Sequence, residues 1–278
     1  MPRTIGLLHP GEMGSVVGEA ARVGGARVLW VSGGRSPATR SRAQSAGLED
    51  AGTLAQLVAQ SDVILSVCPP ANAIDIAREV AALGFGGTYV DGNAVSPATT
   101  RAIGDVVADG GARYVDGGII GPPPRKAGTT RLYLSGQGAT DVAALFAGSH
   151  LEAIALDGPI GAASAMKVAY ASWTKGSQAL ILAVRAFATH EGVDDALLRE
   201  WARSQPDLSK RSENAVASNV KKAWRFVGEM EEISASYGAV GLPDEFHQAC
   251  AEIYRRLAGW KDTPTPPSVT EVAKTLAP

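Results

Sequence analysis

One lysine lies where the sequence predicts acid–base chemistry at a ligand-binding cleft. Lys167 closes the segment Gly158-Pro-Ile-Gly161-Ala-Ala-Ser-Ala-Met-Lys167, in which glycines and small side chains open a long helical pattern. A helix that begins with small residues can pack closely on another surface, and clefts form at such junctions. A lysine partly withdrawn from water there can give a proton to an oxygen as hydride reaches the carbon, or accept one in reverse. Most lysines simply lie in water, but we expect Lys167 to be the general acid/base.

The helix that contains Lys167 presents small and polar side chains on the same face as the lysine. Positions three and four residues apart lie on one side of an α-helix. That spacing groups Ser164, Lys167, Tyr170, Ala171 and Thr174. We therefore expect Ser164, Tyr170 and Thr174 to contact the substrate.

A second segment has the glycine spacing of a turn that binds phosphate. Between a strand-like and a helix-like stretch the chain reads Ile5-Gly-Leu-Leu-His9-Pro-Gly11-Glu-Met-Gly14. Glycine lets the backbone approach a pyrophosphate, and the helix N-terminus that follows faces the negative charge. An ordinary strand–helix turn can also contain two glycines, but the flanking elements and Gly18 favour a nucleotide. We expect a dinucleotide site formed by His9, Pro10, Gly11, Glu12, Met13 and Gly14, with His9 at the first fingerprint position.

The residues after the second predicted strand favour NADP(H) over NAD(H). An NAD site usually offers an acidic side chain there for the ribose 2′-hydroxyl, yet no acid occurs between Arg22 and Glu49. Hydroxyls and guanidinium groups, which suit a 2′-phosphate, occur instead. The arginines can equally serve only to solvate the next helix. We expect the 2′-phosphate to be bound by Ser32, Gly33, Arg35 and Arg40.

The first half of the chain alternates strand-like and helix-like segments. Strands separated by helices imply crossover connections and a largely parallel sheet covered on both faces. Ser96 and Pro97 are expected to be the N-cap and first residue of one helix. The predicted strands are 3–9, 26–32, 63–67, 88–91, 112–116, 131–135 and 151–155, with helices over 12–23 and from about residue 71.

The second half of the chain is predicted to be entirely helical. Residues 162–191 contain no proline and one glycine, which predicts a helix about 45 Å long. Its middle, Ala179-Leu-Ile-Leu-Ala-Val184, is apolar all round, which predicts burial on every side. Asp194, Asp207 and Asp244 are expected as N-caps of later helices, which cover 194–204, 207–217, 221–237, 244–258 and 268–276. The predicted boundary near residues 156–161 gives a nucleotide-binding domain over 1–157 and an all-α domain over 158–278.

Composition excludes several classes of protein. The chain has 278 residues, of which 45% are hydrophobic and 19% charged, and this is an ordinary globular composition. Its 26 basic and 28 acidic residues give a net charge of −2, so nothing favours nucleic acid or an anionic membrane. Two cysteines cannot build a disulfide framework, and no metal-ligand spacing occurs, so we expect no metal. His150, His190 and His247 have no partner at metal or triad spacing.

Targeting and membrane segments are also not expected. The apolar N-terminal stretch is interrupted at once by His9, Pro10 and Glu12, unlike a signal peptide. The longest apolar run, 176–184, ends at Arg185 and is shorter than the roughly 20 residues that a membrane span needs. We expect a cytoplasmic protein with a small-molecule substrate.

Four segments, in order, resemble those of the β-hydroxyacid dehydrogenase superfamily, which includes 3-hydroxyisobutyrate dehydrogenase, 6-phosphogluconate dehydrogenase and the imine reductases. They are the turn Gly11–Gly14, Asp91-Gly-Asn-Ala-Val-Ser-Pro97, Tyr114-Val-Asp-Gly-Gly-Ile-Ile-Gly121 and the hinge Gly158…Gly161…Lys167. Residues 162–175 and 224–233 look most like a subgroup described as phosphogluconate-dehydrogenase-like.

The resemblance implies a Rossmann domain followed by an all-α domain built on the long helix. It also implies NADP(H), catalysis by Lys167, and a homodimer in which the helical domains pack together and help to wall the active site. Asn93 corresponds to a polar group at the nicotinamide ribose or substrate, and Cys68 and Pro69 are included in the predicted cofactor site.

Three departures argue against the substrates of the hydroxyacid enzymes. Their Ser-Gly-Gly substrate loop is replaced by Ile120-Gly121-Pro122, so Ile120 and Gly121 are our expected substrate contacts. The asparagine that follows their lysine is Ala171, and their later Lys-Asp pair is Glu231-Glu232. Neither 3-hydroxyisobutyrate nor 6-phosphogluconate is therefore supported.

Three functions are consistent with these residues. The first is a dehydrogenase or reductase acting on a small carbonyl or hydroxyl compound. The second is an imine reductase, which Tyr170 keeps open although those relatives tend to replace the lysine. The third is a nucleotide-binding protein without catalysis, because a His9 side chain either crowds the turn or adds a phosphate contact.

Overall fold

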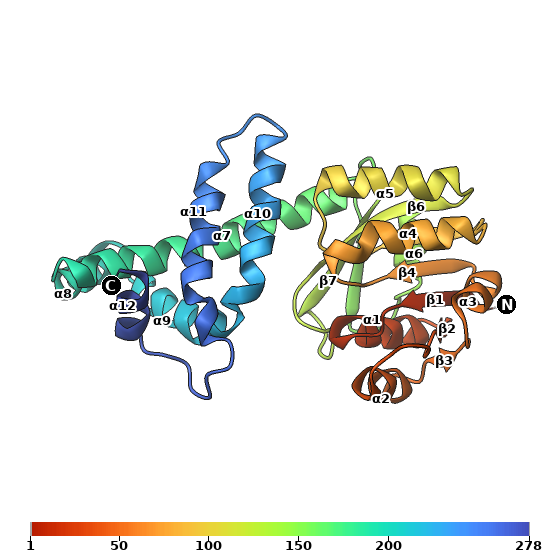
Figure 1. Cartoon of the computed structure of the whole chain (residues 1–278), viewed down its shortest axis with the longest axis horizontal. Helices are drawn as coiled ribbons and strands as arrows, with labels where there is room; N and C mark the ends of the chain where they lie inside the picture. The colour runs from red at the N-terminus through yellow and green to blue at the C-terminus, as the bar shows by residue number, and fades with distance from the viewer. Residues whose placement is uncertain (1, 278) are drawn as a thin grey trace. The chain divides into compact units, whose positions relative to one another are not determined.

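The computed structural model describes residues 2–277 and divides the chain into two compact units, one ending at Lys167 and the other beginning at Val168. The first unit is built on one eight-stranded sheet of order β3-β2-β1-β4-β5-β6-β7-β8 (Figure 1). Only the β6–β7 pairing is antiparallel. The strands are β1 Thr4–Leu8, β2 Arg27–Trp30, β3 Glu49–Asp50, β4 Val63–Ser66, β5 Thr88–Asp91, β6 Arg113–Ile120, β7 Thr130–Ser135 and β8 Leu151–Ala155.

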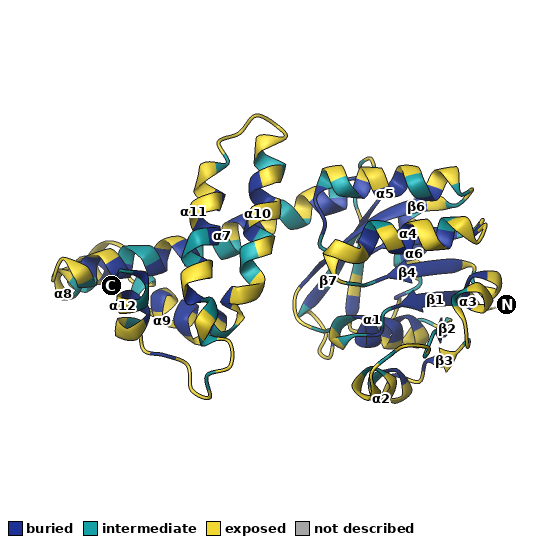
Figure 2. Cartoon of the chain, viewed as in Figure 1, coloured by how far each residue is buried: buried dark blue, intermediate teal, exposed yellow. Residues whose placement is uncertain are grey.

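Helices cover both faces of this sheet, as the sequence predicted. One buried cluster joins the sheet to α1, α2 and α6, and the other joins it to α3, α4 and α5. Figure 2 shows the strands buried and the outer helix faces exposed. The helices are α1 Glu12–Val23, α2 Pro37–Ser45, α3 Leu54–Gln60, η1 Pro70–Asn72, α4 Ala73–Ala82, α5 Pro97–Asp109 and α6 Ala139–Ala144. Ser96 caps α5 as predicted, since its hydroxyl accepts the N–H of Thr99 at 3.2 Å.

The register of the strands lines up one row of residues across the sheet. Leu8 is paired with Ser66, Ser66 with Asp91, Asp91 with Asp116, and Asp116 with Ser135. Four of these five residues are polar and fully buried. The row therefore requires its own hydrogen-bond partners, because an unpaired buried polar group costs stability.

The regular elements within the described residues of the second unit are all helices, as predicted. A single buried cluster joins α7 to the helices that follow it. The helices of this half are α7 Ala162–His190, α8 Asp194–Ser204, α9 Leu208–Asn219, η2 Val220–Lys222, α10 Ala223–Gly238, α11 Glu245–Leu257, η3 Ala258–Trp260 and α12 Val269–Leu276. The first six residues of α7 belong to the first unit.

Two expectations for this half were wrong. The apolar middle of α7 is not buried on every side, because Ala179, Ile181 and Leu182 are buried while Leu180 is 51% exposed. Asp194 is not an N-cap, because it is the first residue of α8 and its carboxylate pairs with Arg185 at 2.6 Å. Asp207 and Asp244 do occupy N-cap positions, but neither side chain accepts a backbone N–H of its helix.

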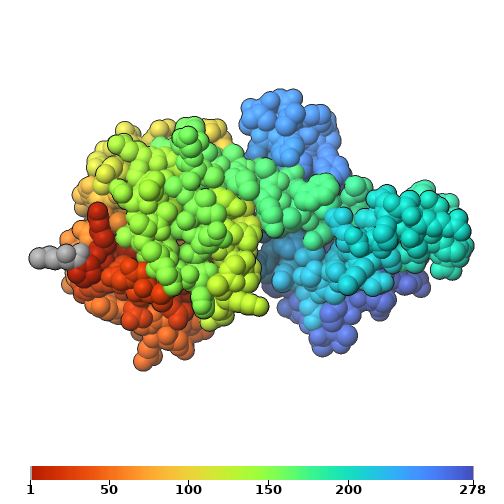
Figure 3. Space-filling view, turned by 180° about the vertical axis from the view of Figure 1, so that it is seen from behind, coloured from red at the N-terminus to blue at the C-terminus, as the bar shows by residue number. Residues whose placement is uncertain are grey.

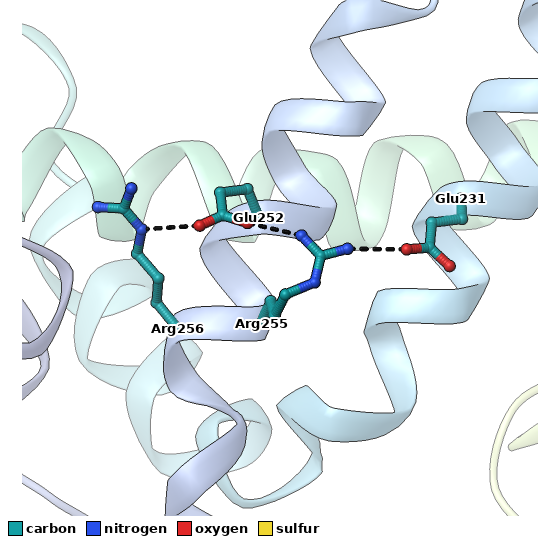
Figure 4. A network of polar contacts seen from close by, with 4 residues as sticks. All are labelled: Glu231, Glu252, Arg255 and Arg256. Atoms are coloured by element: carbon teal, nitrogen blue, oxygen red, sulfur yellow. Dashed lines mark hydrogen bonds and ion pairs between the residues drawn. The ribbon is translucent and has the colours of Figure 1, made fainter.

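Surface charges join α10 and α11. Arg255 lies between Glu231 at 2.8 Å and Glu252 at 2.6 Å, and Glu252 also accepts from Arg256 (Figure 4). All four side chains are about half exposed, so water screens these ion pairs and each contributes little to stability. Glu231 thus lies on a solvated helix face.

Candidate active site

The predicted site residues of the first unit follow four neighbouring parallel strands. The turn at residues 9–14 follows β1, Cys68 follows β4, Asn93 follows β5, and Ile120 ends β6. Carboxyl ends of parallel strands meet at one edge, and open α/β sheets bind ligands there, where the strand order reverses. In this sheet the order reverses between β1 and β4. The fold therefore brings these segments to the edge where a nucleotide would bind.

The turn after β1 has the features that a bound pyrophosphate requires. Gly11 is the N-cap of α1, and no side chain caps that helix end. A Cβ at Gly11 would meet nothing within 4 Å, so the backbone faces open space. A Cβ at Gly14 would collide with the carbonyl oxygen of His9. Gly14 is therefore required by the turn itself, and Gly11 leaves the approach to the helix N-terminus clear.

His9 occupies a conformation that usually belongs to glycine. Its φ of 67° is the only positive value at a non-glycine residue within 2–277. Its carbonyl oxygen accepts the N–H of Gly11 at 2.7 Å, which closes the turn. Burial, together with the charge of Arg35, lowers the pKa of the imidazole to about 4. The His9 ring is therefore neutral at pH 7. Its Nδ1 is buried and has no partner in the described chain.

Arginines cluster after β2, as the sequence predicted. Ser36 caps α2, and Arg40 Nε donates to the carbonyl of Arg35 at 3.3 Å. The Nε atoms of Arg35 and Arg42 are buried without a partner among the described residues. Buried guanidinium donors normally have acceptors. An anionic ligand such as a phosphate would supply them.

One acidic side chain near this cluster was missed by sequence reasoning. Pairing of β2 with β3 places Trp30 opposite Asp50, and the Asp50 carboxylate accepts the N–H groups of Ser32 at 3.2 Å and Gly52 at 2.9 Å. A hydrogen bond with the Ser32 side chain first, and then the one from the Gly52 N–H, lowers the pKa of Asp50. The acid lies 18 residues beyond Ser32, outside the stretch in which an acid is usually sought.

The residues of the turn and of the arginine cluster fit a dinucleotide. Three observations support this: the open space at Gly11, the uncapped start of α1, and the buried Nε of Arg35, which has no partner within residues 2–277. His9 and Gly14 fix the turn. The phosphates would be held by the N-terminus of α1, and the adenosine side by the residues after β2.

Asn93 and Cys68 hold each other in place. The Asn93 side-chain oxygen accepts the N–H of Cys68 at 2.6 Å, and its amide nitrogen donates to Ser66 at 3.1 Å. Burial raises the pKa of the Cys68 thiol to about 11, so it stays protonated at neutral pH. Asn93 is 3% exposed and joins the ends of β4 and β5. Its contact with a ribose or substrate stays a prediction, as do those of Cys68 and Pro69.

Lys167 lies against the end of β6. Its ammonium donates to the carbonyl oxygen of Ile119 at 3.0 Å. Ile120 is buried, and Gly121 ends the strand with φ of 125°, a value that disfavours other residues. The predicted acid/base and the loop that replaces the Ser-Gly-Gly motif are therefore brought together.

The other predicted substrate contacts differ in exposure. Ser164 is 1% exposed, and its hydroxyl donates to Asp116 at 2.6 Å. Tyr170 is 44% exposed, whereas the Thr174 hydroxyl donates to the carbonyl of Tyr170 at 3.0 Å. All three contacts stay predictions.

Asp91 is a buried acid that sequence reasoning left without a role. One oxygen accepts the N–H of Asn93 at 2.8 Å, and the other is buried without a partner in the described chain. Burial first, and then the charge of Asp116 on the next strand, raises the pKa of Asp91 to about 7. Proximity of Asp91 and Asp116 follows from the pairing of β5 with β6.

Replacing Asp91 by asparagine should make stability less dependent on pH. The folded chain holds this proton up to about pH 7, whereas the unfolded chain releases it near the ordinary pKa of 3.8. The contribution of Asp91 to stability is therefore fully present below about pH 4 and is lost as pH rises through about 7. Relative to the original protein, Asp91→Asn should gain in Tm between about pH 5 and about pH 8. Parallel Tm–pH curves would contradict this, and Asp109→Asn, an exposed change, is the control.

A serine–histidine pair in the second unit was also missed. His247 Nε2 lies 2.7 Å from Ser172 Oγ, which also bonds to Tyr237 at 2.8 Å. The two residues are 75 positions apart, so sequence spacing gave no signal. Burial lowers the pKa of His247. Among the described residues no group of three or more His, Cys, Asp or Glu is placed to hold a metal ion.

Comparison with protein families matches residues 4–147 to the family described as "NAD binding domain of 6-phosphogluconate dehydrogenase". This match covers more than half of the chain. The chain belongs to this family. Residues 188–257 match a second family, "Domain of unknown function (DUF1932)". These matches confirm the resemblance to the β-hydroxyacid dehydrogenase superfamily.

Among curated proteins, an uncharacterized 28.5 kDa protein of Methanothermus fervidus, in the 7S RNA 5′ region, is 32% identical over 166 residues. The match covers 59% of this chain and 63% of that relative, so it spans less than two thirds of the relative's length.

Solved structures share the fold over nearly the whole chain. A conserved protein of unknown function, reported as similar to 3-hydroxyacid dehydrogenases, has a TM-score of 0.76 and 26% identity over 93% of this chain and 98% of its own. Mycobacterium tuberculosis 3-hydroxyisobutyrate dehydrogenase with L-serine gives 0.74 and 18%, covering 100% of both chains. Aspergillus terreus reductive aminase with NADPH gives 0.58 and 18%, covering 99% of both. Together with the family, these similarities support an NAD(P)-binding oxidoreductase.

No helix within residues 2–277 is both long enough and apolar enough to span a bilayer.

Proposed function

We propose that this protein transfers hydride between NADP(H) and a small carbonyl or hydroxyl compound, with Lys167 as general acid/base. The observation that carries the proposal is the 3.0 Å hydrogen bond from Lys167 Nζ to the carbonyl of Ile119. It holds the ammonium at the end of β6, at the edge of the sheet where ligands of this fold bind.

Different residues would bind the cofactor and transfer the proton. The N-terminus of α1 and the turn from His9 to Gly14 would hold the pyrophosphate. The nicotinamide, when bound, supplies or accepts the hydride. Lys167 gives its proton to the carbonyl oxygen as that atom gains negative charge, or removes the hydroxyl proton in the reverse direction. The Ile119 carbonyl orients the ammonium without neutralising it, since a carbonyl carries no net charge.

The substrate is expected to be less charged than a sugar acid. Ile119 and Ile120 place apolar, buried side chains at the end of β6, and Ile120 takes the place of the serine in the Ser-Gly-Gly motif of the hydroxyacid enzymes. Purified protein should be tested with NADPH against aldehydes, ketones and cyclic imines, and with NADP⁺ against alcohols and hydroxyacids, by nicotinamide absorbance. Turnover of carbonyl or hydroxyl compounds alone supports the proposal.

Two other outcomes of that assay would replace it. Turnover of imines alone would indicate an imine reductase, which the exposed Tyr170 one turn after Lys167 keeps as the second candidate. NADPH binding without hydride exchange on any compound would indicate a protein that only binds the nucleotide.

NADP(H) is proposed over NAD(H) because of the arginines after β2. Arg35→Ala should weaken NADPH binding by about tenfold or more and leave NADH binding nearly unchanged, since a charge-assisted hydrogen bond contributes about 1.5–3 kcal/mol. Titration by fluorescence measures both affinities, with Arg78→Ala on α4 as the control. Asp50 is the competing feature, because its carboxylate would repel a phosphate near Ser32. The preference for NADP(H) would be contradicted if Arg35→Ala weakened the binding of NADPH and NADH equally. It would also be contradicted if Asp50→Asn selectively lost NADH binding.

We also propose a homodimer that forms through α7. Five large apolar side chains of this helix are exposed, including Trp173 at 68% and Phe187 at 66%. With the less exposed Ser177 and Val184 added, successive positions are alternately four and three residues apart. This is the spacing of a helix face that packs against another helix. In Figure 3, α7 (green to teal) lies open at the surface. This α7 stripe consists of Met166, Tyr170, Trp173, Ser177, Leu180, Val184 and Phe187.

Charged substitutions in the α7 stripe should yield monomers. A glutamate at the centre of an apolar interface loses hydration without gaining a partner, which costs several kcal/mol. Trp173→Glu and Leu180→Glu should each halve the mass measured by light scattering. Val240→Glu is the matched control, because Val240 is 72% exposed but lies outside α7. An original protein that is monomeric, or variants that stay dimeric, would contradict this assembly.

The near-zero net charge gives no support for a nucleic-acid partner, and we propose a cytoplasmic location.

A further inference from the structure

Asp116 is the centre of a buried hydrogen-bond network. One carboxylate oxygen accepts the Ser135 hydroxyl and the backbone N–H groups of Gly161 and Ser164, each at 3.0 Å. The other accepts the hydroxyls of Ser164 at 2.6 Å and Thr100 at 3.1 Å. Five donors therefore converge on a side chain with 0% exposure.

Three of these donors lie at the start of α7: the N–H of Gly161, and the N–H and hydroxyl of Ser164. The first turn of a helix has N–H groups without partners inside the helix, and the residue before α7 is Gly161, which has no side chain to supply a cap. The acceptors come instead from the sheet: Asp116 for Gly161 and Ser164, and Ser135 for the N–H of Ala163 at 3.0 Å. A negative charge at a helix N-terminus is also favoured by the helix dipole.

The same strand touches α7 directly. A Cβ at Gly118 would lie 2.8 Å from the carbonyl oxygen of Ala163 and 3.2 Å from Cβ of Lys167. The next residue of the strand, Ile119, accepts the hydrogen bond from the Lys167 ammonium. Three residues of β6 therefore contact α7. Asp116 binds the beginning of the helix, Gly118 lies against the stem of Lys167, and Ile119 accepts from its Nζ.

We propose that Asp116 is a positioning residue for Lys167. Its carboxylate fixes the position of the first turn of α7 and the rotation of the helix about its axis. Lys167, one turn later, therefore meets the carbonyl of Ile119. This role rests on the proposed function of Lys167. Asp116 would act on the reaction only through the position of that lysine, without contacting the substrate. A cap that serves only folding would hold the helix without affecting the chemistry at Nζ.

The test compares Asp116→Asn with Thr100→Val. Asparagine has the same size but places an NH₂ group where one carboxylate oxygen accepts, so at least two donors lose their acceptor. The control, Thr100→Val, removes one donor to the same carboxylate without removing a contact to α7. Because a misplacement of about 1 Å can cost about 100-fold in rate, kcat should fall by at least about tenfold in Asp116→Asn, with KM and NADPH affinity within about twofold. Thr100→Val should keep kcat within about threefold.

A second readout does not require turnover. The rate at which the Lys167 amine is methylated by formaldehyde and a borohydride, followed by peptide mass spectrometry, reports its hydrogen bonding and accessibility. This methylation rate should change at least about threefold in Asp116→Asn and little in Thr100→Val, because hydrogen bonding to the ammonium controls how readily it loses its proton. Unchanged kcat and unchanged methylation in Asp116→Asn would overturn the proposal, as would equal effects of the two substitutions.

Two further results keep the inference decidable. If Asp116→Asn does not fold, Ser135→Ala, which removes the acceptor of the Ala163 N–H, should show the same changes in smaller degree. If Lys167→Ala stays active, the proposed function fails, whereas the methylation rate still decides whether Asp116 positions the lysine.

Discussion

Lys167→Ala is expected to lower kcat by at least about 100-fold, the lower range for the loss of a general acid/base. The ammonium is the only group assigned to move a proton, and water cannot replace a donor held by the Ile119 carbonyl. NADPH affinity should stay within about twofold, because the turn follows β1 and the arginine cluster follows β2, and neither includes Lys167. Steady-state kinetics with the best substrate of the panel and a fluorescence titration of NADPH measure the two quantities.

Controls separate this loss from an effect on folding. Lys274→Ala on α12 removes an exposed lysine of the second unit and should leave kcat unchanged. Lys167→Arg keeps the charge but not the proton transfer, because arginine does not release its proton near neutral pH. Turnover within about tenfold of the original in Lys167→Ala would show that another group supplies the proton.

Gly11→Ala is expected to weaken NADPH binding while the protein stays folded. A methyl group there meets no atom of the chain, and φ of −70° is open to alanine, so the free energy of unfolding should change by at most about 1 kcal/mol. The same methyl group would occupy the space through which a pyrophosphate approaches the backbone. We expect at least about tenfold weaker binding, or about 1.4 kcal/mol.

Gly14→Ala provides the contrast. Its methyl group would collide with the carbonyl oxygen of His9, so the turn itself must move. A backbone clash of this kind should cost about 1–3 kcal/mol of stability, together with NADPH affinity. Thermal unfolding and NADPH titration of both variants measure this difference. If Gly11→Ala binds NADPH normally, the pyrophosphate does not lie at this turn.

Local sequence patterns were sufficient for much of the fold. The predicted bounds of α1, β5, β8 and α8 agree with the structure, because capping residues, glycines and periodicity act over a few residues. The spacing of Gly11 and Gly14 also predicted the turn after β1 correctly. No bounds were predicted for the short elements α2, β3, α3 and α6, since each is too short to show a clear hydrophobic period.

The residue types that could bind a nucleotide and move a proton were therefore determined by the sequence alone. Which groups meet was decided by strand register and helix packing: Asp50 beside Ser32, Asp91 beside Asp116, and the Asp116 carboxylate at the start of α7. The apolar middle of α7 shows the same limit, because hydrophobicity indicates that a surface avoids water but not what covers it. Contacts between residues 18 to 48 positions apart depend on the whole sheet, and no local pattern encodes them.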